Sequence, residues 1–197
     1  MRPSLEYQHA FDLCAMAAYQ RGGPVLVLAS SAFYARELED RLECCAVRVA
    51  GADSQGEPAD PPARTIIWAA PDAASAEPTL QRFLPTLAPD GQLFLICSGP
   101  LARRLPEWQG PSPLLSGQPV GPWLLRKVLR RGGLRLLARY GFHGPASILW
   151  GRLGQRLEQG GRPDWADRCQ FQMRARYTER GVLTNLAPVG VLVAARP

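Results

Sequence analysis

The strongest constraint on the fold of this chain is a series of short apolar segments that carry no charge. They lie at residues 25–30 (VLVLAS), 65–70 (TIIWAA) and 92–98 (QLFLICS), and segments with helical spacing separate them. A continuous apolar run of this length is typical of a strand that is buried on both faces of a parallel sheet. The alternation of such strands with helices predicts an α/β fold, in which helices cover both faces of an open sheet.

Capping residues and turn residues predict the limits of the other elements. Ser4 can cap a first helix, and the sequence RGGP at 21–24 stops it. The expected helices cover residues 4–20, 32–43, 74–87, 123–140 (as one or two helices) and 165–180. The expected strands cover residues 25–30, 45–49, 65–70, 91–99, a segment within 142–150, and 189–197.

The length and composition of the chain fit one globular domain over residues 1–197. Of the 197 residues, 46% are hydrophobic and 20% are charged, which is enough to form a core and excludes a disordered chain. Within the domain we expect an N-terminal helix in 1–23, a loop in 98–122 and a basic part in 123–197. No apolar run approaches the roughly 20 residues of a membrane span, and the first residues do not resemble a signal peptide. We therefore expect a cytoplasmic protein without a transmembrane segment.

The cysteines and histidines give no metal-binding pattern. The five cysteines include the adjacent pair Cys44 and Cys45, and no two of them have the CxxC spacing. His9 and His143 lie far apart in the sequence. We therefore predict no metal site, and we expect buried free thiols, as in a cytosolic protein.

Positive charge is concentrated in the C-terminal part of the chain. The net charge is −4 over residues 1–120 and +10 over residues 121–197. In the Arg-rich segment 123–140, helical spacing would place an apolar stripe between basic flanks. This pattern fits an ordinary solvent-facing helix, an anionic lipid surface or a protein partner. A nucleic-acid partner is less favoured because the segment lacks interleaved aromatic residues.

Three segments, in this order, resemble the class I S-adenosylmethionine-dependent methyltransferases. Residues 64–96 have the family's order of strand, loop, helix and next strand, with L-x-P-x-G-x-L at 87–93. Residues 133–148 are similar to its late helix, Gly-Phe turn and following strand, and residues 186–197 to its closing antiparallel strand. The resemblance implies a Rossmann-like, mostly parallel sheet with an antiparallel C-terminal strand.

The resemblance also implies S-adenosylmethionine as the cofactor, bound beyond the carboxyl ends of the strands. The residues that match these positions are Ala29, Ser30 and Ser31 after the first strand, Asp53 after the second, and Ala70, Pro71 and Asp72 after the third. Methyl transfer needs mainly positioning, so the sequence assigns no catalytic residue. Ser98 and His143 are further polar residues at strand ends, and each also fits a structural role.

The sequence departs from the family pattern in two ways. The family's first strand ends in an acidic, glycine-rich loop, but residues 25–35 contain neither glycine nor an acid. Only about 15 residues separate the second strand from Thr65, so the sheet is expected to be shortened there. Two functions therefore remain open. One is a divergent methyltransferase with a small-molecule acceptor. The other is a non-catalytic, methyltransferase-like binding or scaffold subunit that has lost the cofactor.

Overall fold

The fold is built on one seven-stranded sheet with the strand order β2-β1-β3-β4-β7-β5-β6. The computed structural model describes residues 5–29, 31–51, 61–71, 74–99, 121–180 and 186–197. The strands are β1 (Val25–Ala29), β2 (Val47–Gly51), β3 (Ala63–Ala69), β4 (Leu87–Ser98), β5 (Arg135–Phe142), β6 (Thr178–Arg180) and β7 (Val189–Ala195). The helices are α1 (Leu5–Arg21), α2 (Ala32–Arg41), α3 (Ala76–Phe83), α4 (Pro122–Arg131), α5 (Pro145–Gln159) and α6 (Pro163–Ala175), with a short 3-10 turn at Leu84–Thr86.

The directions of the strands confirm the predicted sheet. β1 pairs in parallel with β2 and β3, and β3 pairs in parallel with β4. β7 lies antiparallel between β4 and β5, so the closing strand runs against its neighbours as expected. β2 is an edge strand of the described sheet, and β3 follows it in the chain, which agrees with the predicted shortening.

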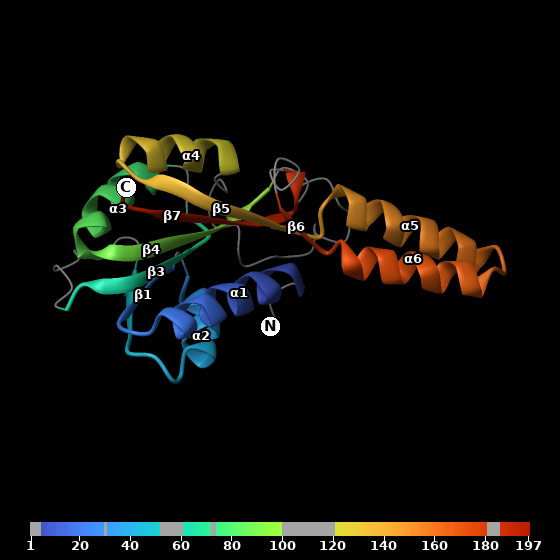
Figure 1. Ribbon diagram of the computed structural model, residues 1–197, viewed down its shortest axis with the longest axis horizontal. Coiled ribbons are helices and arrows are strands. Elements are labelled where there is room, and N and C mark those ends of the chain that lie inside the picture. The colour runs from blue at the N-terminus through green and yellow to red at the C-terminus, as the bar shows by residue number, and fades with distance from the viewer. Residues whose placement is uncertain (1–4, 30, 52–60, 72–73, 100–120, 181–185) are drawn as a thin grey trace.

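Two hydrophobic cores lie on the two faces of the sheet. α1 and α2 cover one face, and α3 and α4 cover the other (Figure 1). Alternate residues of the continuous apolar strands point into each core. In β1, for example, Val25 and Val27 face the first helix pair, and Leu26 and Leu28 face the second. This two-sided burial explains why the strand has no polar residue.

The expectation of one or two helices over residues 123–140 is correct for the first part of the segment and wrong for the second, which is a strand. α4 ends at Arg131, Gly133 has the left-handed φ of 71°, and β5 begins at Arg135. Leu137 is an extra residue in β5, because Leu136 pairs with Ala194 and Ala138 already pairs with Val193. This β-bulge breaks the alternation of a strand and leaves two adjacent leucines that imitate helical spacing.

The expected strand within residues 142–150 is also wrong, because α5 begins at Pro145. Proline suits the first turn of a helix, since its missing N–H would have no partner there. The last expected helix is shorter than 165–180: α6 ends at Ala175, and β6 follows at Thr178–Arg180.

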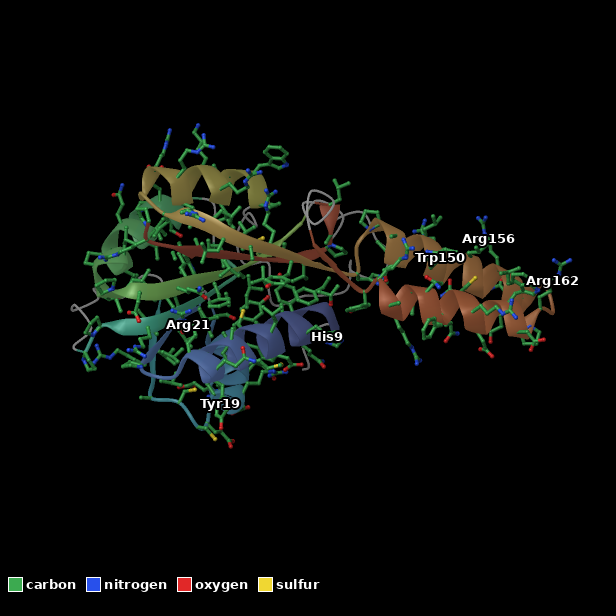
Figure 2. The ribbon with its side chains drawn as sticks, viewed as in Figure 1. His9, Tyr19, Arg21, Trp150, Arg156 and Arg162 are labelled. Atoms are coloured by element: carbon green, nitrogen blue, oxygen red, sulfur yellow. The ribbon has the colours of Figure 1, made fainter. Side chains whose placement is uncertain are left out.

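α5 and α6 form a helical hairpin that projects beyond the sheet (Figure 1). Small residues on α5 let the two helices approach closely: a Cβ on Gly154 would lie 3.3 Å from Cβ of Cys169. Figure 2 shows Arg156 and Arg162 extending from this hairpin into solvent. The chain enters and leaves the hairpin at neighbouring positions, because Phe142 pairs with Thr178, and the N–H of His143 donates to Tyr177 O at 2.8 Å.

The thiols differ in burial. Cys14, Cys97 and Cys169 are buried as expected, whereas Cys44 is exposed and Cys45 is half-buried. Burial raises the pKa of the Cys97 thiol to about 12. Among the helices of the described part, none combines the length and the apolar character needed to cross a membrane.

Candidate functional site

Three neighbouring parallel strands end in small residues that lie side by side. Ala29 of β1 pairs with Gly51 of β2 on one side and with Ala69 of β3 on the other. We call these three residues the small-residue row. All three residues are small, and Ala29 and Ala69 are buried in the core on the α1–α2 side. In open α/β sheets, ligands bind at this carboxyl edge.

An aromatic cluster formed by Tyr7, Phe11 and Tyr34 lies on the α1–α2 side of this edge. The ring centroids of Tyr7 and Tyr34 are 5.5 Å apart, and those of Phe11 and Tyr34 are 5.6 Å apart. The cluster belongs to the same core as Ala29 and Ala69. Burial raises the pKa of both tyrosines, so their hydroxyl groups stay protonated at neutral pH. The rings therefore close one face beside the small-residue row.

A buried hydrogen bond ties this cluster to the end of β4, since Tyr7 Oη lies 2.6 Å from Ser98 Oγ. Replacing Tyr7 by phenylalanine is expected to lower the free energy of unfolding by about 1–2 kcal/mol, because buried Ser98 loses its partner while the ring packing stays. Urea unfolding followed by circular dichroism measures the change. Tyr19→Phe is the matched control, because the Tyr19 side chain is 69% exposed. Equal midpoints for Tyr7→Phe and the unmodified protein would contradict the structural role of this bond.

The described predicted site residues lie at this edge, each with a structural role of its own. Ser31 is the N-cap of α2, and its hydroxyl accepts from the N–H of Tyr34 at 3.5 Å. The N–H of Ala70 donates to Ile96 O at 2.9 Å, and Pro71 is buried. The other predicted residues, Ser30, Asp53 and Asp72, lie outside the described part of the chain.

His143, a candidate from the sequence, follows the end of β5 and lies in a histidine–tyrosine group whose assembly the sequence did not predict. His9 and His143 both contact Tyr177, with ring centroids 5.0 Å and 5.5 Å from it. His9 also stacks on Phe142 at 6.4 Å. The two histidines are far apart in the sequence, and only the folded sheet brings α1 and the end of β5 together. The sequence Gly-Phe-His at 141–143 is the feature that marks His143 in the chain.

Hydrogen bonds assign the position of the His143 proton in the neutral ring. The Ser147 hydroxyl donates to Met173 O at 3.3 Å, so its oxygen is left to accept. His143 Nδ1 lies 3.2 Å from that oxygen and is therefore the protonated nitrogen. In this tautomer the lone pair of the neutral ring lies on Nε2, and a general base needs a nitrogen of this kind.

Backbone strain is found at the same edge. The non-glycine residues with a positive φ in the described part are Ala70 (50°) and His143 (54°). Each follows the last residue of a strand, Ala69 of β3 and Phe142 of β5. Such strain is uncommon outside ligand-binding and catalytic sites, where the surrounding structure holds it. The strain therefore supports a functional site at the carboxyl edge.

A groove of about 520 Å³ leads to this edge along α1. It runs between α1 and the strands β4, β7 and β5. His9 and Phe142 line its end at the carboxyl edge, and Gln20 and Gln92 line the opposite end. Its volume lies within the range of small-molecule sites. Most of the lining is apolar, so the groove suits an elongated ligand with an apolar body.

Solved structures with a similar fold are methyltransferases. The CcbJ methyltransferase from Streptomyces caelestis superposes with a TM-score of 0.56 at 12% identity, over 100% of this chain and 97% of that one. A SAM-dependent methyltransferase from Geobacter sulfurreducens, in complex with S-adenosyl-L-homocysteine, gives a TM-score of 0.47 at 16% identity, over 98% and 92% of the two chains. The glycopeptide N-methyltransferase MtfA, complexed with sinefungin, gives 0.49 at 13% identity, over 95% and 87%.

The similarity to CcbJ shows the class of fold. The chain has a class I SAM-dependent methyltransferase-like fold, as its sequence pattern predicted. No protein-family model matches the sequence, and no curated protein matches it. The likeness therefore rests on the fold.

The described residues at the carboxyl edge are small, and two of them are packed into the core. Ala29 and Ala69 are buried in the same core as Tyr34. The family's glycine loop is replaced, and the Ser31 hydroxyl takes up one of the amides at the start of α2. The described part of the edge therefore offers a ligand small side chains and backbone groups, and one of its hydroxyls is already used as a helix cap.

Proposed function

We propose that the protein is a divergent S-adenosylmethionine-dependent methyltransferase that acts on a small molecule. The observation that carries the proposal is the methyltransferase-like fold over the whole chain, with the small-residue row at the edge where this fold binds ligands. The cofactor contacts would come from residues Ala29, Ser30, Ser31, Asp53, Ala70, Pro71 and Asp72.

In this proposal the groove along α1 holds the acceptor, and His143 receives its proton. The bound cofactor would supply an activated methyl group on its sulfonium. The small-residue row would orient the nucleoside, and the apolar groove would exclude water from the acceptor. His143 follows Phe142, which lines the end of the groove, and the tautomer described above puts the lone pair of its neutral ring on Nε2. An acceptor hydroxyl or amine would thus lose its proton to this nitrogen as it attacks.

A specific observation also favours the second function, a non-catalytic binding or scaffold subunit. Tyr7 and Tyr34 are buried beside the small-residue row, and their rings fill one face of the edge. Ser31 uses its hydroxyl as a helix cap. In this alternative the cluster replaces the cofactor as the packing partner of the strand ends.

Calorimetric titration with S-adenosylmethionine and S-adenosylhomocysteine distinguishes the two functions. We expect a dissociation constant in the micromolar range, on the order of −8 kcal/mol, for the unmodified protein. Asp53→Ala is expected to weaken binding about tenfold, because a carboxylate that accepts from ribose hydroxyls is lost. Asp90→Ala is the matched control, since Asp90 forms an exposed ion pair with Arg64 that lies 3.9 Å away.

One outcome would contradict the enzyme, and another would contradict the role of Asp53. Absence of heat and of a thermal shift at millimolar ligand, with folding confirmed by circular dichroism, would leave the scaffold as the better function. Equal weakening by Asp53→Ala and Asp90→Ala would remove the ribose contact from the proposal.

A further inference from the structure

Basic side chains gather around a second cavity, which is separate from the carboxyl edge. This cavity of about 440 Å³ lies between α4 and the start of β5. Four of its lining residues are cationic, namely Arg126, Lys127, Arg130 and Arg135. Its floor is apolar, and the lining among the described residues includes no acidic side chain. We call it the cationic cavity.

The charges of the cationic cavity are not neutralised within the described part of the chain. The ion pairs found there involve Arg41, Arg64 and Arg131, and none of them includes a cation of the cavity. Arg131 on the same helix shows the contrast, because its Nη1 lies 2.9 Å from Glu77 Oε2. Four cations that share one cavity without a carboxylate create a positive potential, and a bound anion lowers its energy.

Trp123 and Arg139 add to the evidence that the cationic cavity can bind an anion. The Arg126 guanidinium lies over the Trp123 ring, 5.6 Å from its centroid, which orients the charge at one wall of the cavity. Arg139 of β5 lies outside the lining, and burial together with the charge of Arg126 lowers its pKa. Trp123 is 70% exposed, so its indole can contact a ligand in the cavity.

We propose that the cationic cavity binds a phosphate-type anion that carries more than one negative charge. Arginine presents paired N–H donors that match phosphate oxygens, and three of the four cations are arginines. Several cations around one cavity suit a diphosphate better than a single carboxylate. The source of the phosphates is a soluble diphosphate or an anionic lipid headgroup, and the apolar floor accepts either. This site does not depend on the proposed methyltransferase activity.

Calorimetric titration of the full chain at low ionic strength tests the proposal. The probes are inorganic pyrophosphate, adenosine diphosphate, and vesicles of phosphatidylcholine with and without cardiolipin, whose headgroup carries two phosphates. We expect binding that weakens as salt is added, because the cations are exposed enough to be screened. Arg126→Ala and Arg130→Ala are each expected to weaken binding about tenfold.

Arg131→Ala is the matched control, because Arg131 lies on the same helix but pairs with Glu77. Its binding constant is expected to equal that of the unmodified protein. Binding of pyrophosphate or adenosine diphosphate supports a soluble ligand, and binding of the anionic vesicles alone supports the headgroup. No binding of any probe would overturn the site. Equal weakening by Arg130→Ala and Arg131→Ala would also overturn it, because diffuse helix charge would then explain the result.

Discussion

A Gly99→Ala substitution is expected to lower the free energy of unfolding by about 3 kcal/mol or more. Gly99 follows the last residue of β4, and its N–H donates to Pro188 O at 2.7 Å. A Cβ at this position would lie 1.7 Å from the carbonyl oxygen of Ala187. The obstructing atom belongs to the backbone and cannot rotate away. The start of β7 would have to separate from the end of β4.

Urea unfolding followed by circular dichroism measures this effect. Gly121→Ala is the control, since nothing lies within 4 Å of the Cβ that it would add. Gly121 is the N-cap of α4, so its replacement is expected to cost less than about 1 kcal/mol. A Gly99→Ala protein as stable as the Gly121→Ala protein would show that β4 and β7 do not meet as closely as described.

Stability is expected to fall steeply in alkaline solution, because four buried groups keep their protons in the folded protein. Burial raises the pKa of Cys14 and Cys97 from the ordinary 9.0, and that of Tyr7 and Tyr34 from 10.0. Above these values the unfolded chain releases protons that the folded chain retains. The stabilisation is therefore complete below pH 9.0 and, for Cys97, is lost between pH 9.0 and about 12.

Each group contributes a slope of up to about 1.4 kcal/mol per pH unit. Urea midpoints at a series of pH values from neutral to alkaline measure the total slope. Cys97→Ala is expected to flatten it, because one ionising group is removed from the unfolded chain. Ile67→Val is the control: it removes a buried methyl group at a cost of about 1 kcal/mol and leaves the slope unchanged. A midpoint independent of alkaline pH would contradict the burial of these groups.

The central strands could be predicted because their sequence has a single physical explanation. Val25–Ala29 and Ala63–Ala69 face a helix layer on each side, so nearly every position is apolar. Only a strand that is covered on both faces keeps all the side chains of such a run out of water. The closing strand Val189–Ala195 is apolar for the same reason. It lies between β4 and β5, and its residues belong to both cores.

The C-terminal part was harder to predict because its polar elements allow more than one structure. The bulge at Leu137 gives β5 a helix-like spacing, and only its pairing with β7 selects the strand. The candidate site likewise has a part that local sequence predicts and a part that depends on how distant segments pack. The positions of Ala29 and Ala70 at the ends of strands were predictable, and their contact with a cofactor stays a prediction. The meeting of His9 with His143 depends on the position of α1 across the sheet, which no local pattern records.

The helical hairpin α5–α6 begins and ends at neighbouring backbone positions, beside the paired residues Phe142 and Thr178. The hairpin therefore connects β5 and β6 in the way that a tight turn connects two adjacent strands. Its length and sequence can change during evolution without a shift in strand register, because the two flanking strands stay joined by their own hydrogen bonds. A short turn in place of residues 144–176 should likewise leave a closed sheet, which makes this position suitable for grafting another module onto the fold.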